Sequence, residues 1–153
     1  GALAITAASH CKEIDGVAAI SAPSDFQDWG KDPNQLLEYS RDVGTISDSE
    51  FPPNKKSWAA EIESIDPLKA AEGMSEKPLL VIHGASDQVV PSFDARVIAD
   101  AHGGADLRII DGGTHRLRFD PRATAIIIGW LDRTYRLQAK NNTPSSHSVP
   151  KGK

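Results

Sequence analysis

The residues best suited to chemistry are a carboxylate, Asp87, and an imidazole, His115, each of which follows an apolar run and a turn. Asp87 lies in the segment HGASDQVVP, directly after the run LLVI, and His115 lies in GGTHRLR, after the run LRII. A carboxylate bonded to an imidazole fixes the ring's tautomer, so that the other ring nitrogen can act as a general base. Gly112 and Gly113 allow a turn tight enough to aim the ring back over a sheet. We therefore predict a hydrogen bond between Asp87 and a ring nitrogen of His115.

Other side chains could compete for these roles. Asp25 follows another apolar run and is a possible alternative acid, whereas Asp111 precedes the glycine pair and is expected to shape its loop. His83 could be imagined in a metal site with Asp87 and His115, but the chain has no H-x-x-x-H or similar ligand spacing. We expect no metal, and we expect His83 to pack and hydrogen-bond beneath the turn that holds Asp87.

Two tryptophans and two arginines are further candidates for binding. Trp29 and Trp58 could line a substrate pocket, although two aromatic residues in a long connection also suit its own small core. Arg116 and Arg118 are expected to anchor the loop of His115 to nearby carboxylates, or else to bind an acidic group of a substrate.

The elements around these residues predict an α/β fold with a parallel sheet. Unbroken apolar runs are typical of parallel strands that helices cover on both faces, and residues 79–82 should form a central strand. Further strands are predicted at residues 16–21 and 107–110. Helices are predicted at residues 2–9, 35–41, 58–65 and 92–102, and a final helix is predicted to begin at Thr114 or Asp120 and to run to about residue 137. These elements predict a three-layer αβα arrangement with right-handed crossovers.

The chain is long enough for one domain, which we place at residues 1–139. Residues 27–75 interrupt the strand and helix pattern and are either a lid or cap over the strand ends or a helical crossover with a long loop. Residues 140–153 are polar, contain proline and lack periodicity, so a disordered tail is expected there.

Composition narrows the classes of partner. The chain has 153 residues, a net charge of −4 and 39% hydrophobic residues, which argues against nucleic acid and acidic membrane surfaces as partners. No apolar run approaches the roughly 20 residues of a membrane span. Cys11 is the single cysteine, so an internal disulfide is excluded and a cytoplasmic location is expected. No phosphate-binding glycine motif is present, and we expect no cofactor.

Three segments together resemble the C-terminal half of an α/β-hydrolase. HGASDQVVP resembles the acid turn after that fold's seventh strand, and GGTHRLR resembles its histidine loop after the eighth strand. GALAITAAS at the start of the chain is similar to the helix that follows the nucleophile elbow, G-x-S-x-G-G. Residues 58–68, WAAEIESIDPL, are similar to the peptidase and acyl-hydrolase branches of the superfamily.

This resemblance implies a partial α/β-hydrolase fold made of its last three strands and their helices. It implies a serine hydrolase that cleaves an ester, thioester or peptide bond of a small molecule or peptide through an acyl-enzyme, with Asp87 as acid and His115 as base. Ser21, Ser24, Ser86 and Ser92 lack the G-x-S-x-G context, so the nucleophile is expected upstream of residue 1.

Two consequences follow from that expectation. The 153-residue chain alone should be inactive, and it is expected to self-associate through an exposed edge of its sheet. The alternative is a non-catalytic α/β module that binds a partner with the same end of the sheet.

Overall fold

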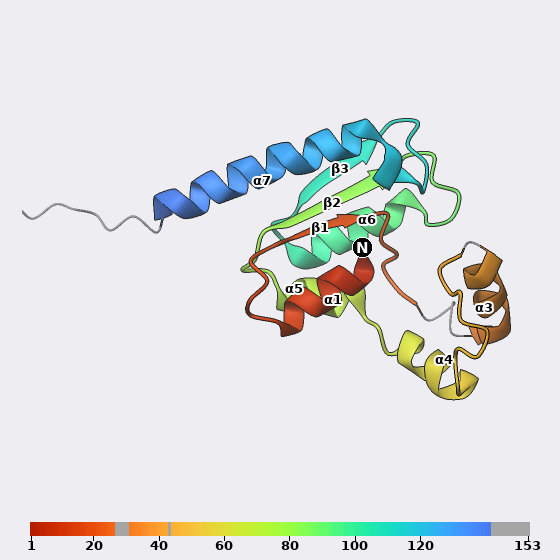
Figure 1. Ribbon diagram of the computed structural model, residues 1–153. Helices are drawn as coiled ribbons and strands as arrows, with labels where there is room; N and C mark the ends of the chain where they lie inside the picture. The colour runs from red at the N-terminus through yellow and green to blue at the C-terminus, as the bar shows by residue number, and fades with distance from the viewer. Residues whose placement is uncertain (27–30, 43, 142–153) are drawn as a thin grey trace, which may run out of the picture.

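The chain forms a three-stranded parallel sheet between two layers of helices, as a computed structural model shows (Figure 1). The structure describes residues 1–26, 31–42 and 44–141. The strands are β1 (Val17–Ile20), β2 (Leu79–Gly84) and β3 (Asp106–Ile110), in the order β1-β2-β3. The predicted central position of residues 79–82 is confirmed, and so is the parallel αβα arrangement.

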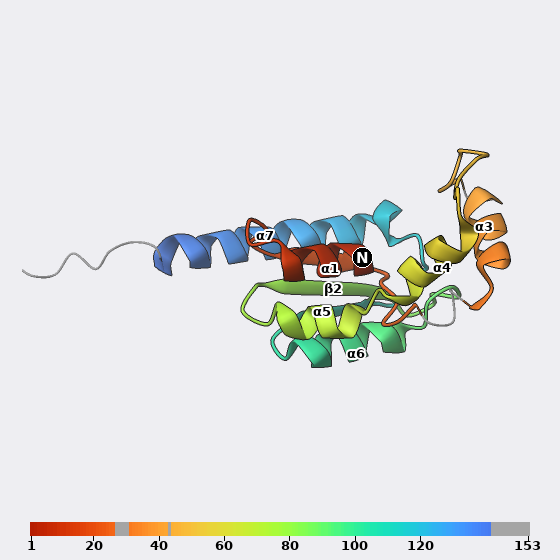
Figure 2. The same cartoon turned by 90° about the horizontal axis from the view of Figure 1, so that it is seen from below.

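The helices divide between the two faces of the sheet (Figure 2). Helices α5 and α6 lie on one face and α7 covers the other. The buried side chains of α1 belong to the same core as those of α5 and α6. The bounds are α1 (Ala2–His10), α3 (Pro33–Asp42), α4 (Lys55–Glu63), α5 (Pro67–Gly73), α6 (Ser92–His102), the 3-10 helix η1 (Leu117–Phe119) and α7 (Pro121–Asn141).

The apolar run of β2 is explained by its burial on both faces. Leu79 and Val81 point into the core formed with α1, α5 and α6, while Leu80 and Ile82 point into the core beneath α7, where Trp130 also lies. All four side chains are buried. Successive side chains of a strand point to opposite faces, so a strand with helices on both sides must be apolar throughout.

Several helix ends follow local signals in the sequence. Gly103 ends α6 with a φ of 78°, a left-handed conformation that glycine adopts without strain. Asp120 precedes α7, and its side chain accepts a hydrogen bond from the backbone N–H of Arg122 at 2.9 Å. Of the two predicted starts for the last helix, the one at Asp120 is therefore confirmed. The helix continues to Asn141, slightly into the predicted tail, and the rest of that tail lies outside the described residues.

Helix α5 is an element that the sequence interpretation missed. Asp66 caps it by accepting from the N–H of Lys69 at 2.9 Å, and Pro67 occupies its first turn. It packs beside α1 and α6 in the helix layer, as the burial of Ala70 and Ala71 in the shared core shows. Within the described part of residues 27–75, α3 and α4 stand apart from the helix layers, beyond the carboxyl ends of the strands (Figure 1).

No helix in the described part of the chain is both long enough and apolar enough to cross a membrane.

Candidate active site

The loops after β2 and β3 are bonded to each other, and this fixes the positions of Asp87 and His115. The N–H of Ala85 donates to the carbonyl of Ile110 at 2.9 Å, and the N–H of Ser86 donates to the carbonyl of Gly113 at 2.8 Å. Gly84 lies so close to Gly113 that a Cβ on Gly84 would overlap the Gly113 carbonyl. Two parallel strand ends thus carry their polar side chains to one edge of the sheet.

Asp87 and His115 are hydrogen-bonded, as predicted. Nδ1 of His115 lies 2.9 Å from Oδ2 of Asp87. The other carboxylate oxygen, Oδ1, accepts from the N–H of Val89 at 2.8 Å and from the N–H of Val90 at 3.0 Å. With both oxygens engaged, the carboxylate cannot rotate freely, and its orientation toward the imidazole is fixed by the backbone.

Asp87 is ionised at neutral pH. Burial of its carboxyl group alone would raise the pKa, but the hydrogen bonds from the N–H groups of Val90 and Val89 and from His115 outweigh that effect, and the pKa is lowered. An ionised carboxylate only accepts hydrogen bonds, so Nδ1 of His115 carries the proton. The free lone pair of the ring is then on Nε2, which is the arrangement that a general base needs.

His83 supports the acid turn from below. Its side chain is fully buried, and its Nε2 lies 3.0 Å from the carbonyl oxygen of Val90 and 3.1 Å from Oδ2 of Asp87. Because both neighbours are acceptors, Nε2 of His83 carries the proton. This is the packing and hydrogen-bonding role expected from the sequence. Among the residues that the structure describes, no three His, Cys, Asp or Glu side chains are grouped so that they could hold a metal ion.

His115 opens onto a cavity of about 780 Å³. Its side chain is 37% exposed, whereas that of Asp87 is fully buried, so the base is accessible and the acid is not. The cavity lies between the ends of the strands and α3. Its walls include Gly1, Ile20, Ser21, Leu36, Tyr39, Ser40, Asp42, Thr45, Val89, Arg116 and Arg118.

The sequence allowed a lid or cap over the strand ends at residues 27–75, but no residue of α3 was among the predicted site residues. Leu36 and Tyr39 of α3 line the cavity, and the apolar residues of this helix gather on one side, as is typical of a surface helix. That pattern was visible in the sequence, but it did not distinguish a lid or cap over the strand ends from a helical crossover with a long loop.

Two other predicted site residues, Asp25 and Trp58, do not line this cavity. Asp25 follows β1 and is exposed, and the carboxylate bonded to Nδ1 of His115 is that of Asp87. Trp58, on α4, packs edge to face against Phe51 with ring centroids 6.0 Å apart. This agrees with the alternative interpretation, in which the aromatic residues form a small core within the long connection. Trp29 lies outside the described residues.

Comparison with solved structures places this geometry in a known fold. The chain superposes on the esterase domain of a Rhodothermus marinus protein with a TM-score of 0.60 and 20% identity, over 86% of this chain and 57% of that one. Est1E from Butyrivibrio proteoclasticus gives a TM-score of 0.57 and 18% identity, over 91% and 58%. MGS-MChE2, an α/β-hydrolase enzyme from the metagenome of lagoon sediments at Mar Chica, Morocco, gives 0.63 and 18%, over 87% and 57%.

The chain has part of the α/β-hydrolase fold. It spans between 57% and 58% of the length of these three structures. No family model and no curated protein matches the sequence. From the sequence resemblance we expected the acid turn of the α/β-hydrolase fold after β2 and its histidine loop after β3. In the structure these two loops are hydrogen-bonded to each other.

Proposed function

We propose that the chain is the C-terminal portion of a serine hydrolase that cleaves an ester, thioester or peptide bond through an acyl-enzyme. The observation that carries this proposal is the bond between His115 Nδ1 and buried Asp87 Oδ2, which leaves His115 Nε2 accessible at a cavity. In this role Nε2 takes the proton of a serine hydroxyl as its oxygen attacks the substrate carbonyl, and then delivers that proton to the leaving group. Water hydrolyses the acyl-enzyme by the same route.

The serine is proposed to belong to a segment that precedes residue 1. Gly1 lines the same cavity as His115, so a residue joined to its nitrogen would lie at this cavity. A Cβ on Gly1 would lie 2.7 Å from the Cβ of Ala22 and 2.8 Å from the carbonyl oxygen of Ile20, so that position requires glycine. This agrees with the glycine that ends the motif G-x-S-x-G-G.

The test compares this chain with a version extended upstream through the serine. The extended protein should hydrolyse activated esters and react with a phosphonate probe for activated serines, whereas the 153-residue chain should do neither. His115→Ala should lower kcat/KM of the extended protein by at least about 10³-fold. His10→Ala is the matched control, because His10 is exposed at the end of α1, and it should leave turnover unchanged. An extended protein that neither turns over esters nor labels would instead favour a binding module.

A further inference from the structure

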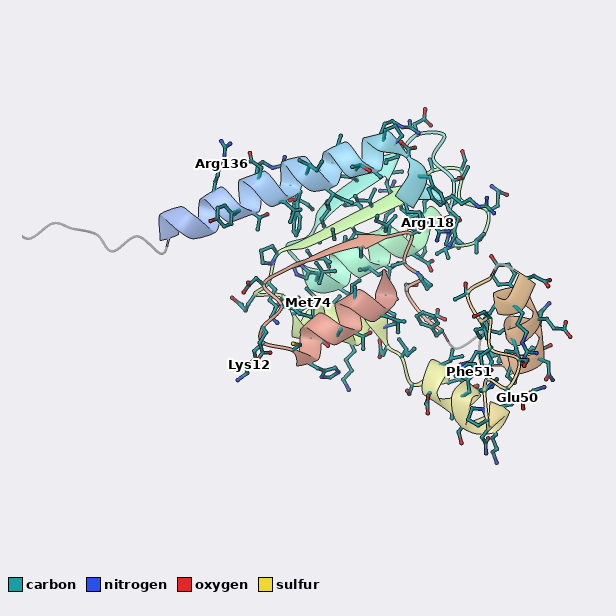
Figure 3. All side chains as sticks on the ribbon, viewed as in Figure 1. Lys12, Glu50, Phe51, Met74, Arg118 and Arg136 are labelled. Atoms are coloured by element: carbon teal, nitrogen blue, oxygen red, sulfur yellow. The ribbon has the colours of Figure 1, made fainter. Side chains whose placement is uncertain are left out.

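Two arginines lie at the cavity beside His115. Arg116 is the next residue in the chain, and Arg118 lies in η1; both line the cavity and both side chains are exposed. Leu117, between them, is 1% exposed and packs in the core beneath α7. Burial of Leu117 anchors this short helix and leaves Arg116, which precedes it, and Arg118 on the accessible side. Figure 3 shows Arg118 at the end of the sheet that faces α3.

Neither guanidinium is neutralised within the described part of the chain. The sequence led us to expect anchoring to nearby carboxylates, but no carboxylate oxygen of a described residue lies within 4.0 Å of either guanidinium. For the described residues, that expectation was wrong. Other arginines do have such partners: Arg122 is bonded to Asp120 at 2.7 Å, and Arg108 to Asp106 at 3.3 Å. The chain as a whole has a net charge of −4, so a positively charged group at the cavity is opposite in sign to the protein's overall charge.

Arg118 is also held in position by an aromatic ring. Its guanidinium carbon lies 4.7 Å from the centroid of the Phe119 ring, which is within the range of a cation–π contact. Phe119 is otherwise 70% exposed. A guanidinium stacked on a ring keeps its N–H donors in its own plane, free to bind a carboxylate or a phosphate with two parallel hydrogen bonds.

We propose that Arg116 and Arg118 bind an anionic oxygen group, a carboxylate or a phosphate, on the substrate of this site. The inference rests on the proposed function, in that the same molecule carries the bond that His115 helps to cleave. Asp42 is the opposing charge on the α3 side of the cavity, but two cations against one anion leave the His115 side positive. An anionic substrate is therefore attracted to the mouth of the cavity and oriented beside the base.

The binding test uses the 153-residue chain and two esters of the same acid. Monomethyl glutarate carries one carboxylate, and dimethyl glutarate is its neutral counterpart; propyl phosphate serves as the phosphate probe. Binding is followed through the NMR signals of the His115 ring. We expect the monoester or propyl phosphate to bind at least about tenfold more tightly than the diester, and the tighter of the two identifies the anionic group. Raising the salt from about 20 to about 200 mM should weaken this binding.

The variants assign the effect to the two arginines. The double substitution Arg116→Gln and Arg118→Gln should weaken anion binding at least about tenfold and leave diester binding unchanged. The double substitution Arg96→Gln and Arg133→Gln is the matched control, because it removes the same two charges from exposed positions on α6 and α7. Equal affinity for the monoester and the diester, no binding of either anionic probe, or unchanged binding by the double variant would each overturn the proposal.

The outcome is separable from that of the proposed function. In the extended protein, hydrolysis of a neutral p-nitrophenyl ester as efficient as that of its carboxylate analogue would support the hydrolase and refute the anion site. Anion binding that depends on the arginines in a protein without turnover would support the anion site and refute the hydrolase.

Discussion

Nδ1 of His115 lies 2.9 Å from Oδ2 of Asp87, across two loops that leave neighbouring strands. The carboxylate of Asp87 is restrained from rotating, because its other oxygen, Oδ1, accepts hydrogen bonds from the backbone N–H groups of Val89 and Val90. The carboxylate therefore presents a fixed acceptor to the ring. Nε2 of His115 is left as the accessible nitrogen, and the tautomer is set by Asp87.

The first prediction concerns that tautomer. Asp87→Asn keeps the shape of the side chain and, with its oxygen on the Val89 and Val90 N–H groups, turns an amide donor toward His115. The ring must then accept at Nδ1 and carry its proton on Nε2, where it cannot act as a base. We expect kcat of the extended protein to fall by about 10³- to 10⁴-fold with little change in KM. Steady-state kinetics with an activated ester measure this, and a loss of less than tenfold would remove Asp87 from the acid role.

The second prediction concerns stability and pH. The pKa of Asp87 is lower in the folded chain than in the unfolded one, because backbone and His115 hydrogen bonds outweigh burial. The resulting stabilisation is present above the unfolded pKa of about 3.9 and is lost as the pH falls through the folded value. Asp87→Asn should therefore lower the free energy of unfolding by about 1 to 3 kcal/mol at pH 7. The difference should shrink below about pH 4 in urea unfolding curves; a difference that stays constant would contradict it.

The parts of the site that could be predicted are those determined by residues close together in the sequence. The strand at 79–82 and the turn around Asp87 were predictable because burial on both faces and turn chemistry leave a direct trace in neighbouring residues. The pairing of Asp87 with His115 was predictable because parallel strands end at the same edge of a sheet. Helix α5 was missed although Asp66 and Pro67 mark its start, since at 7 residues it is too short to show a clear apolar period.

Local pattern did not predict which residues line the cavity beside His115, although it allowed a lid or cap over the strand ends at residues 27–75. Its far wall comes from α3, which reaches the strand ends through a long connection whose path no periodicity specifies. Among the described residues, neither Arg116 nor Arg118 has a carboxylate partner, and this too depends on where residues distant in the sequence lie.

The third prediction concerns the contact between the two loops. Gly84→Ala places a Cβ against the Gly113 carbonyl and 2.9 Å from the carbonyl oxygen of Thr114, and neither backbone group can move without disturbing the loop of His115. We expect a loss of about 3 kcal/mol in the free energy of unfolding, at the upper end of overpacking costs. Gly104→Ala is the control, because its nearest atoms belong to the ring of His102 at 3.9 and 4.0 Å. Thermal unfolding of both variants measures the difference, and equal stability would mean that the loops can separate.

The fourth prediction concerns the outer edge of β1. Val17 and Ser21 donate their N–H groups to the carbonyls of Pro78 and Ile82 on the β2 side, so the intervening N–H groups of Ala18 and Ile20 face away from β2. The strand reads VAAI and carries no charge or proline, whereas the opposite edge strand, β3, carries the charged pair Asp106 and Arg108. Unpaired apolar edges promote pairing between chains.

We therefore expect the 153-residue chain to associate at micromolar concentration through β1. Ala18→Pro removes an outward donor without removing a bond to β2, and it should shift the protein toward monomer. Ala18→Ser keeps the donor at similar size and should associate like the wild type. Sedimentation velocity at several concentrations, with circular dichroism to confirm that each variant is folded, makes the comparison. A wild-type chain that sediments as one monomeric species at every concentration would show that the edge of β1 does not pair.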